Sequence, residues 1–283
     1  MKYIFLILFS LSYVYGQKTI IYDKDNNLAM DIYYPHGFKE NKSYPVFAWV
    51  HGGGFSGGSR NDADEVKRMK DAKERGYVAI SISYRLLANS SKGFGCELLK
   101  KEKVNIFKEA ALDVLKALDY IQSQQKVVNF KVDKLILGGS SAGAETILNA
   151  HYLRDLWFGS LFNHVKIDGL VSYAGAIVDS RYITSNNIVP TVFVHGLNDD
   201  VVPPIEASHR SCLSHQEGFV PLVGSASLVK MYNVLQTPIL AIFSKSGKHE
   251  WSSYKIEYLN EIFSFIDHSI LNSFNQSVIR YVD

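Results

Sequence analysis

The chain has 283 residues, 47% of them hydrophobic, and its 30 lysine and arginine residues against 28 aspartate and glutamate residues give a net charge of +2. That length can bury a core large enough for one sizeable domain or two smaller ones. No basic stripe and no run of five like charges occurs, which excludes the electrostatic pattern of a nucleic-acid-binding protein and makes a small or neutral substrate the expected partner.

The first 16 residues have the pattern of a secretion signal. One lysine precedes an apolar run from Tyr3 to about Leu11, and Val14 and Gly16 occupy the small positions that a signal peptidase reads. This run is shorter than the roughly 20 residues of a membrane-spanning helix, and no later segment approaches that length. We therefore expect residues 1–16 to be cleaved and residues 17–283 to form one secreted or periplasmic domain without a membrane span.

Strands and helices alternate along the rest of the chain. Residues 28–35 alternate apolar and polar side chains as a half-buried strand does, and residues 45–51 form a continuous apolar run that predicts a strand buried on both faces. Further strands are predicted at 18–23, 77–83, 134–139, 169–175, 191–196 and 237–244. Helices are predicted at 61–75, 104–124, 144–153, from about 225, and up to about 270. This order predicts an α/β fold with a mostly parallel central sheet and helices on both faces.

A glycine-rich turn, His51-Gly52-Gly53-Gly54-Phe55, follows the strand at 45–51 directly. Glycines leave backbone N–H groups free to converge on a negatively charged oxygen, which an acyl-transfer site requires. A phosphate-binding loop is the alternative, but the lysine and hydroxyl residue of such a loop are missing. The turn therefore favours acyl transfer.

The pentapeptide Gly139-Ser140-Ser141-Ala142-Gly143 lies between a predicted strand and a predicted helix. A sharp turn in that position lifts a serine hydroxyl above the sheet, and glycines two residues to either side remove Cβ atoms that would collide. Ser141 is the predicted nucleophile because it stands between the two glycines, and Ser140 is interpreted as a small turn residue. Glu145 is interpreted as a first-turn acid of the helix.

Two later strand ends carry an acid and a histidine. Asp199 and Asp200 follow the strand at 191–196, and either could orient a catalytic imidazole or serve as a turn residue. His249 follows the strand at 237–244, where a loop can place it over the serine. His195 is interpreted as structural. His209 and His215 are interpreted as surface residues, because they lie in a polar segment with no strand before it. A metal site formed by them with Cys212 is the alternative, but their spacing matches no zinc pattern and no metal is expected.

Nucleophile, acid and histidine in the order 141, 199 and 249 follow the chain order of α/β-hydrolases. From about residue 28 to about residue 268, the sequence resembles the esterase and lipase branch of that superfamily, including the bacterial carbohydrate-type esterases. The resemblance implies a triad of Ser141, Asp199 and His249, because the segment His-Gly-x-x-Asp-x-Val-Val-Pro selects Asp199 over Asp200. It also implies oxyanion N–H donors from Gly53, Gly54 and Ala142.

Two features depart from that resemblance. Few residues precede His51, which leaves little room for N-terminal cap helices, and residues 205–232 form an unusually long connection between the acid and the histidine. This connection contains Cys212, Phe219 and a predicted helix, so we expect it to form part of the pocket wall. Cys96 and Cys212 can form one disulfide in an oxidising compartment, although two free thiols remain the alternative.

The sequence therefore predicts a secreted serine esterase that cleaves small-molecule or saccharide-linked carboxylic esters without a cofactor. A lipase, a serine peptidase of the same fold and a non-catalytic binding relative are the alternatives. The segment 84–103, with Lys92, Lys100, Lys101 and Lys103, is too polar for the apolar lid expected of a lipase. Nothing in the sequence indicates an oligomeric state or selects among feruloyl, acetyl-xylan and short aliphatic esters.

Overall fold

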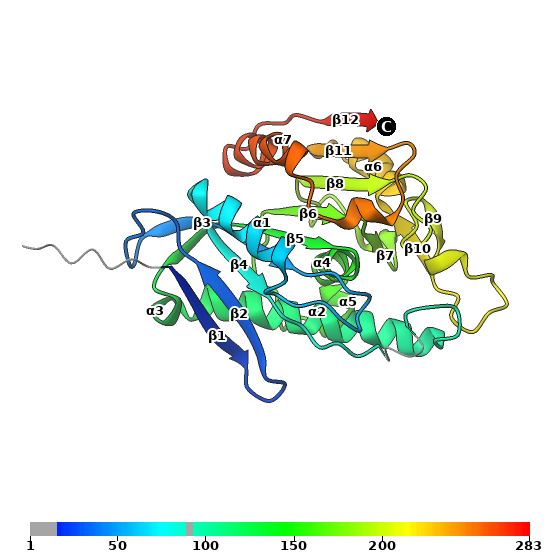
Figure 1. The fold of residues 1–283 in the computed structure, drawn as a ribbon, viewed down its shortest axis with the longest axis horizontal. Helices are drawn as coiled ribbons and strands as arrows, with labels where there is room; N and C mark the ends of the chain where they lie inside the picture. Colours follow the sequence, from blue (N-terminus) through cyan, green and yellow to red (C-terminus); the bar gives the residue numbers. More distant parts are fainter. Residues whose placement is uncertain (1–15, 89–92) are drawn as a thin grey trace, which may run out of the picture.

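The computed structural model describes residues 16–88 and 93–283, and in these ranges nine strands form one sheet (Figure 1). Across the sheet the strands are β1 (Gln17–Asp23), β2 (Leu28–Tyr33), β4 (Val78–Ile82), β3 (Ser43–Val50), β5 (Lys131–Ser140), β6 (Gly169–Tyr173), β8 (Thr191–Gly196), β11 (Ile239–Ser244) and β12 (Val278–Val282). The pairs β1–β2 and β2–β4 are antiparallel and all other neighbours are parallel. The predicted mostly parallel sheet is confirmed. The predicted secretion signal lies outside the described residues except for Gly16.

Both faces of the sheet are buried, as the side chains of β3 show. Val46, Ala48 and Val50 belong to one hydrophobic cluster, whereas Phe47 and Trp49 belong to a second cluster on the opposite face. Successive side chains of a strand point to opposite faces, so a strand covered on both sides needs an unbroken apolar run. The continuous apolar run at 45–51 is therefore the pattern expected of a strand buried on both faces.

Helices cover the two faces separately (Figure 1). The first cluster receives side chains from α2 (Lys100–Ser123), α4 (Ala142–Tyr152) and α6 (Ser225–Val234), and the second from α1 (Ala63–Glu74) and α7 (Leu259–Phe265). Short helices α3 (Gln125–Val128) and α5 (Arg154–Phe158) follow α2 and α4, and a π-helical turn, Ile266–Leu271, extends α7. The predicted helices on both faces are confirmed.

Two predicted elements differ from the structure in extent or burial. Strand β2 is buried along its whole length, so the predicted half-buried strand is wrong. Its buried Asp31 forms an ion pair with Arg60 at 3.0 Å. Helix α2 begins at Lys100 and not at residue 104. Its first turn includes Lys103, whose buried Nζ donates to the carbonyl oxygen of Gly218 at 2.6 Å.

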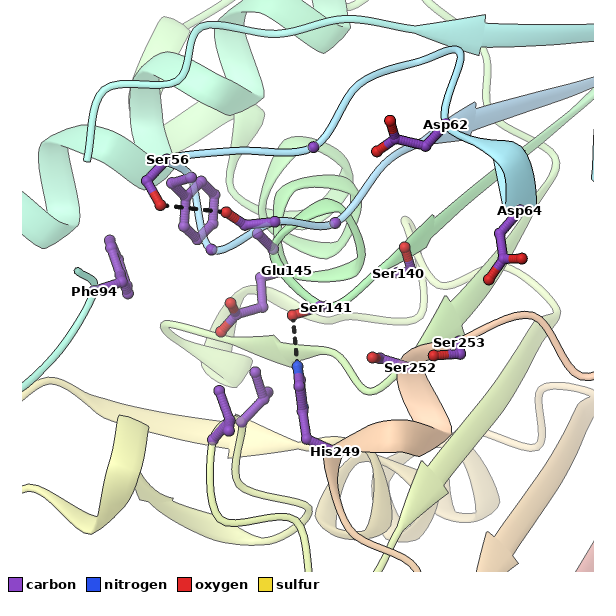
Figure 2. A pocket seen from close by; sticks show the side chains of 18 of the residues that line it. Ser56, Asp62, Asp64, Phe94, Ser140, Ser141, Glu145, His249, Ser252 and Ser253 are labelled. Carbon is purple, nitrogen blue, oxygen red and sulfur yellow. Dashed lines mark hydrogen bonds between the residues drawn. The ribbon is translucent and has the colours of Figure 1, made fainter. Parts of the chain in front are cut away.

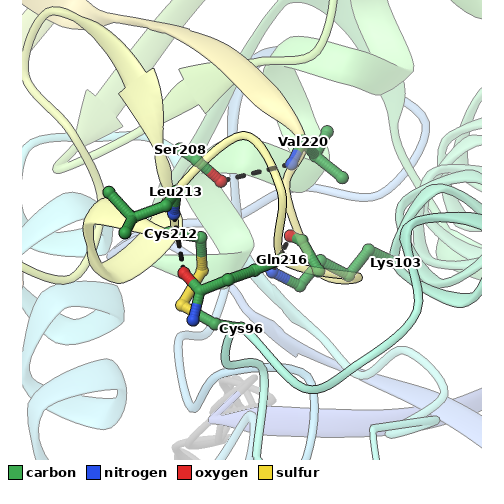
Figure 3. Close-up of a disulfide and its surroundings, with 8 residues drawn as sticks. Cys96, Lys103, Ser208, Cys212, Leu213, Gln216 and Val220 are labelled. Atoms are coloured by element: carbon green, nitrogen blue, oxygen red, sulfur yellow. Dashed lines mark hydrogen bonds between the residues drawn. A yellow bond between two sulfur atoms is a disulfide. The ribbon is translucent and has the colours of Figure 1, made fainter.

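The segment 205–232 folds back along the start of α2. It contains β9 (Glu206–Ser208) and β10 (Pro221–Gly224), which join β7 (Ala176–Ile177) in a small antiparallel sheet. A disulfide between Cys96 and Cys212, with an S–S distance of 2.01 Å, ties this segment to the one preceding α2 (Figure 3). No helix within residues 16–88 and 93–283 has an apolar stretch long enough to cross a bilayer.

Candidate active site

The four motifs meet at one edge of the sheet. They follow the carboxyl ends of β3, β5, β8 and β11, which run parallel to one another, and such ends gather at the same edge. Residues from all four loops line a single cavity of about 710 Å³ that contains Ser141 and His249.

Ser141 sits in the sharp turn between β5 and α4. Its backbone has φ 50° and ψ −123°, a strained conformation for a residue with a side chain. A Cβ on Gly139 would lie 2.5 Å from the backbone of Gly143, and a Cβ on Gly143 would lie 2.2 Å from the carbonyl oxygen of Val50. Both glycines are therefore required for the close approach of strand and helix, as the motif predicts.

Hydrogen bonds join the three predicted triad residues in one chain. Ser141 Oγ lies 2.9 Å from His249 Nε2 (Figure 2). His249 Nδ1 lies 2.8 Å from Asp199 Oδ2. A carboxylate only accepts hydrogen bonds, so Nδ1 carries the imidazole proton and Nε2 is free to accept the proton of the serine. Asp200 is exposed, and Asp199 is the acid that reaches the histidine.

Asp199 is held by more than His249. Its Oδ1 accepts the backbone N–H groups of Val201 at 2.8 Å and Val202 at 3.0 Å, and its Oδ2 also accepts from His195 Nε2 at 3.1 Å. Burial raises the pKa of Asp199, but the hydrogen bonds from His195 and His249 outweigh this effect and hold the pKa well below its ordinary value. The carboxylate is therefore charged wherever the imidazole of His249 is neutral.

His195 is structural, as the sequence suggests, and it also touches the acid. Its Nδ1 lies 3.0 Å from Oγ of Ser225, which is the first residue of α6. Its Nε2 contacts Oδ2 of Asp199. Sequence reasoning missed this second contact. The available signal was the position of His195 at the strand end, four residues before Asp199.

The glycine-rich turn lies beside Ser141 in the cavity. Gly53 and Gly54 have φ values of +112° and +60°, and a Cβ on Gly53 would lie 2.1 Å from the carbonyl oxygen of Gly57. These positive φ angles favour glycine. Gly53, Gly54 and Ala142, the predicted oxyanion donors, all line the same cavity as Ser141.

The cavity extends to both sides of the Ser141–His249 pair. Figure 2 places Phe94 and Glu145 on one side, and Asp64, Ser252 and Ser253 on the other. The first side, called here the apolar lobe, contains Phe94 and Glu145, together with Phe55, which packs on Phe94, and His209, which contacts both Phe94 and Glu145. The second side, called the polar lobe, contains Asp62, Asp64, Ser252 and Ser253, together with the adjoining Tyr254, Arg68, whose guanidinium lies over the ring of Tyr254, and Glu65, which contacts Arg68.

His209 is not a surface residue, so that prediction is wrong. Its side chain is 3% exposed, and its Nε2 lies 2.7 Å from Oε1 of the buried Glu145. Its ring packs against Phe94 at 5.0 Å and Phe107 at 5.9 Å between centroids. The fold of segment 205–232 over α2 places this histidine in the apolar lobe, and no local sequence pattern signals that contact.

Other residues of the long connection occupy different positions. Arg210 lines the cavity, whereas Phe219 lies in a separate surface depression and His215 is exposed. In the described part of the chain, no three histidine, cysteine, aspartate or glutamate side chains gather in an arrangement that could hold a metal ion.

Comparisons with known proteins find similarity to esterases and to a lipase. The family model described as BD-FAE matches residues 30–155. A secreted triacylglycerol lipase of Gibberella zeae is 24% identical over 188 residues, covering 65% of this chain and 30% of the lipase. Cocaine esterase of Oryctolagus cuniculus is 27% identical over 169 residues, covering 58% of this chain and 28% of that enzyme. The chain thus spans less than a third of these relatives.

The fold is shared with a solved esterase of similar size. Esterase 2 of Thermogutta terrifontis superposes with a TM-score of 0.64 at 14% identity, covering 89% of this chain and 92% of that one. This likeness shows an α/β-hydrolase fold, and the matched family model and the curated relatives make the chain similar to the esterase and lipase branch of that superfamily.

Proposed function

We propose that this protein is a serine esterase that hydrolyses carboxylic esters through an acyl-enzyme. The observation that carries the proposal is the hydrogen-bonded chain from Asp199 through His249 to Ser141, with Ser141 opening into a cavity. In this arrangement Ser141 is the nucleophile, His249 the general base and Asp199 the residue that orients the base.

The reaction proceeds in two steps at Ser141. His249 Nε2 takes the serine proton as Oγ attacks the ester carbonyl, and the N–H groups of Gly53, Gly54 and Ala142 stabilise the negative oxygen that develops. When the tetrahedral intermediate collapses, the C–O bond to the alcohol breaks and His249 gives the proton to the leaving oxygen. Water then attacks the acyl-enzyme by the same route and releases the acid. No step requires a metal ion or a cofactor.

A small-molecule ester suits the size of the cavity. Pockets for small ligands enclose roughly 300 to 1,000 Å³, and the cavity here encloses about 710 Å³. The polar lobe, with its carboxylates, serines and arginine, supports a saccharide-linked or otherwise hydroxylated ester better than a lipid one.

Secretion is part of the proposal. The N-terminal pattern of residues 1–16 and the disulfide between Cys96 and Cys212 both suit an oxidising compartment outside the cytosol. One relative in the comparisons is itself described as a secreted lipase.

Covalent labelling tests the nucleophile. A fluorophosphonate probe should label the wild-type protein and should fail to label Ser141→Ala, whose turnover of p-nitrophenyl butyrate should fall by roughly 10⁶-fold. Ser140→Ala is the matched control, because Ser140 also lines the cavity but lies outside the hydrogen-bonded chain.

Turnover assays with an acetylated oligosaccharide and with a peptide anilide separate esterase from peptidase activity. Labelling that survives in Ser141→Ala, or a wild-type protein that cleaves no ester in the panel, would show that the proposal is wrong.

A further inference from the structure

Arg68 is a buried cation in the wall of the polar lobe. Its side chain is 3% exposed, and its guanidinium carbon lies 3.8 Å from the ring centroid of Trp49, 4.7 Å from that of Tyr254 and 5.0 Å from that of Tyr173. Trp49 is itself fixed, since it packs over Gly138 of β5, where a Cβ would lie 2.4 Å from the indole ring. Three aromatic rings therefore hold the guanidinium in one position.

The hydrogen-bonding capacity of this guanidinium is only partly used. Arginine carries five N–H donors, and here Nε makes one long contact of 3.4 Å to Glu65 Oε2. The charge of Arg68 and a hydrogen bond between the two side chains offset part of the rise that burial causes in the pKa of Tyr173. Because the guanidinium lines the cavity, its remaining N–H donors can reach a ligand bound there.

The position of Arg68 relates it to the leaving alcohol. Ser252, Ser253 and Tyr254 of the polar lobe belong to, or directly follow, the short helical turn His249–Ser252. His249 must pass its proton to the leaving oxygen, so the alcohol part of an ester lies on the side of this imidazole. The polar lobe is therefore the place for that alcohol.

The charged side chains of the polar lobe determine which kind of substrate group can bind there. Asp62, Asp64 and Glu65 face the cavity with Arg68, so three carboxylates outnumber one guanidinium and an anionic group is repelled. A neutral hydroxyl group suits this surface, because its oxygen accepts from Arg68 while its proton is donated to a carboxylate.

We propose that Arg68 is a specificity-determining residue that binds a hydroxyl oxygen on the alcohol part of the ester. The proposal rests on the esterase function proposed above and assigns the polar lobe to hydroxylated alcohols. Arg68 binds substrate in this role and takes no part in proton transfer at Ser141.

Two esters with the same acyl chain test this role. Glycerol 1-monobutyrate and propyl butyrate share one carbon skeleton and differ by two hydroxyl groups on the alcohol. The wild-type protein should show a kcat/KM about tenfold higher for the glycerol ester, as expected for a hydrogen bond to a charged donor. Arg68→Met should lose this preference, because its kcat/KM should fall further for the glycerol ester than for propyl butyrate.

Two further variants separate binding from folding. Arg68→Lys keeps a cation over the aromatic rings without the planar fork and should reduce the preference. Lys70→Met also replaces a cation with methionine, at an exposed position of α1, and should leave kcat/KM for both esters unchanged. The rate of fluorophosphonate labelling reports whether Ser141 remains active in each variant.

The outcomes distinguish the two proposals. Equal rates for both esters in the wild type, or an equal loss for both in Arg68→Met and Arg68→Lys, would overturn the role of Arg68 while the esterase function stands. Failure of the wild type to cleave either ester or to react with the fluorophosphonate would overturn the esterase function itself.

Discussion

At the scale of single residues, the unusual group of the site is the Asp199 carboxylate. One of its oxygens serves two imidazoles, those of His249 and His195, and the other accepts two backbone N–H groups. All of these donors favour the charged form and fix the plane of the carboxylate. The proton on His249 Nδ1 is thereby held away from Ser141, which keeps Nε2 available as a base.

Asp199→Asn should lower kcat by about 10⁴-fold, because an amide of the same shape no longer enforces that tautomer or stabilises the imidazolium. Steady-state kinetics with p-nitrophenyl butyrate measure the loss. Asp200→Asn, at the exposed neighbour, is the matched control and should change kcat less than twofold. Retention of more than a tenth of wild-type kcat in Asp199→Asn would contradict this role.

The residues that can be predicted from the sequence are those whose motif is local. The turn around Ser141 requires glycines at fixed offsets, and the strand ends carrying Asp199 and His249 are recognisable from the preceding apolar runs. The contacts of Arg68 with Trp49 and of His209 with Glu145 join residues far apart in the chain. No pattern of spacing encodes such contacts, so they emerge only from the folded arrangement.

At the scale of elements, the disulfide connects two segments that line the apolar lobe. Phe94 lies two residues before Cys96, and His209 lies three residues before Cys212. Gly218 N–H also donates to the carbonyl oxygen of Cys96 at 2.8 Å, so the two segments are joined by backbone as well. The bond therefore fixes the distance between Phe94 and His209.

Replacement of both cysteines by alanine should lower stability and raise KM. The bond spans 116 residues, and closure of a loop of that length stabilises a folded chain by about 5 kcal/mol. Urea unfolding measures the loss, and kinetics with butyrate esters measure the rise in KM, with kcat less affected because Ser141, His249 and Asp199 lie on other loops. Ser211→Ala, at an exposed position beside Cys212, is the control. An unchanged KM would show that the lobe keeps its shape without the bond.

The length of an element decides how well its sequence predicts it. The central strands have continuous apolar runs and α2 has a periodic apolar pattern, so these elements are predicted near their observed positions. Strands β7, β9 and β10 have two, three and four residues, too few for a period to show. The long connection contacts α2 through hydrogen bonds from Lys100 and Lys103 to Glu217 and Gly218, residues far apart in the chain. The sequence carries no pattern for these contacts, so the interpretation of His209 was wrong.

At the scale of the whole molecule, burial on both faces of the sheet also encloses titratable groups away from the cavity. His151, in the last turn of α4, has its Nε2 2.8 Å from the carbonyl oxygen of Asn187, while its Nδ1 is buried without a partner. Because a carbonyl only accepts, Nε2 carries the proton of the neutral ring. A second proton on Nδ1 would meet no acceptor.

This histidine should contribute to the loss of stability in acid. Burial lowers the pKa of His151 from 6.5 to about 4, although the hydrogen bond to Asn187 opposes the shift. Between these two values the unfolded chain binds a proton that the folded chain does not, so stability falls as the pH falls from about 6.5 to 4. The full shift corresponds to about 3 kcal/mol.

His151→Gln isolates that contribution, because glutamine retains an N–H donor for the carbonyl of Asn187 and does not titrate. The variant should differ from the wild type by a constant amount in urea unfolding above pH 7. As the pH falls to about 4, the wild type should lose about 3 kcal/mol more than the variant, whereas other acid-sensitive groups, such as Asp199, affect both proteins equally. A difference that stays constant from pH 7 to pH 4 would mean that the folded protein accommodates the charged imidazole, contrary to the unpartnered burial of Nδ1.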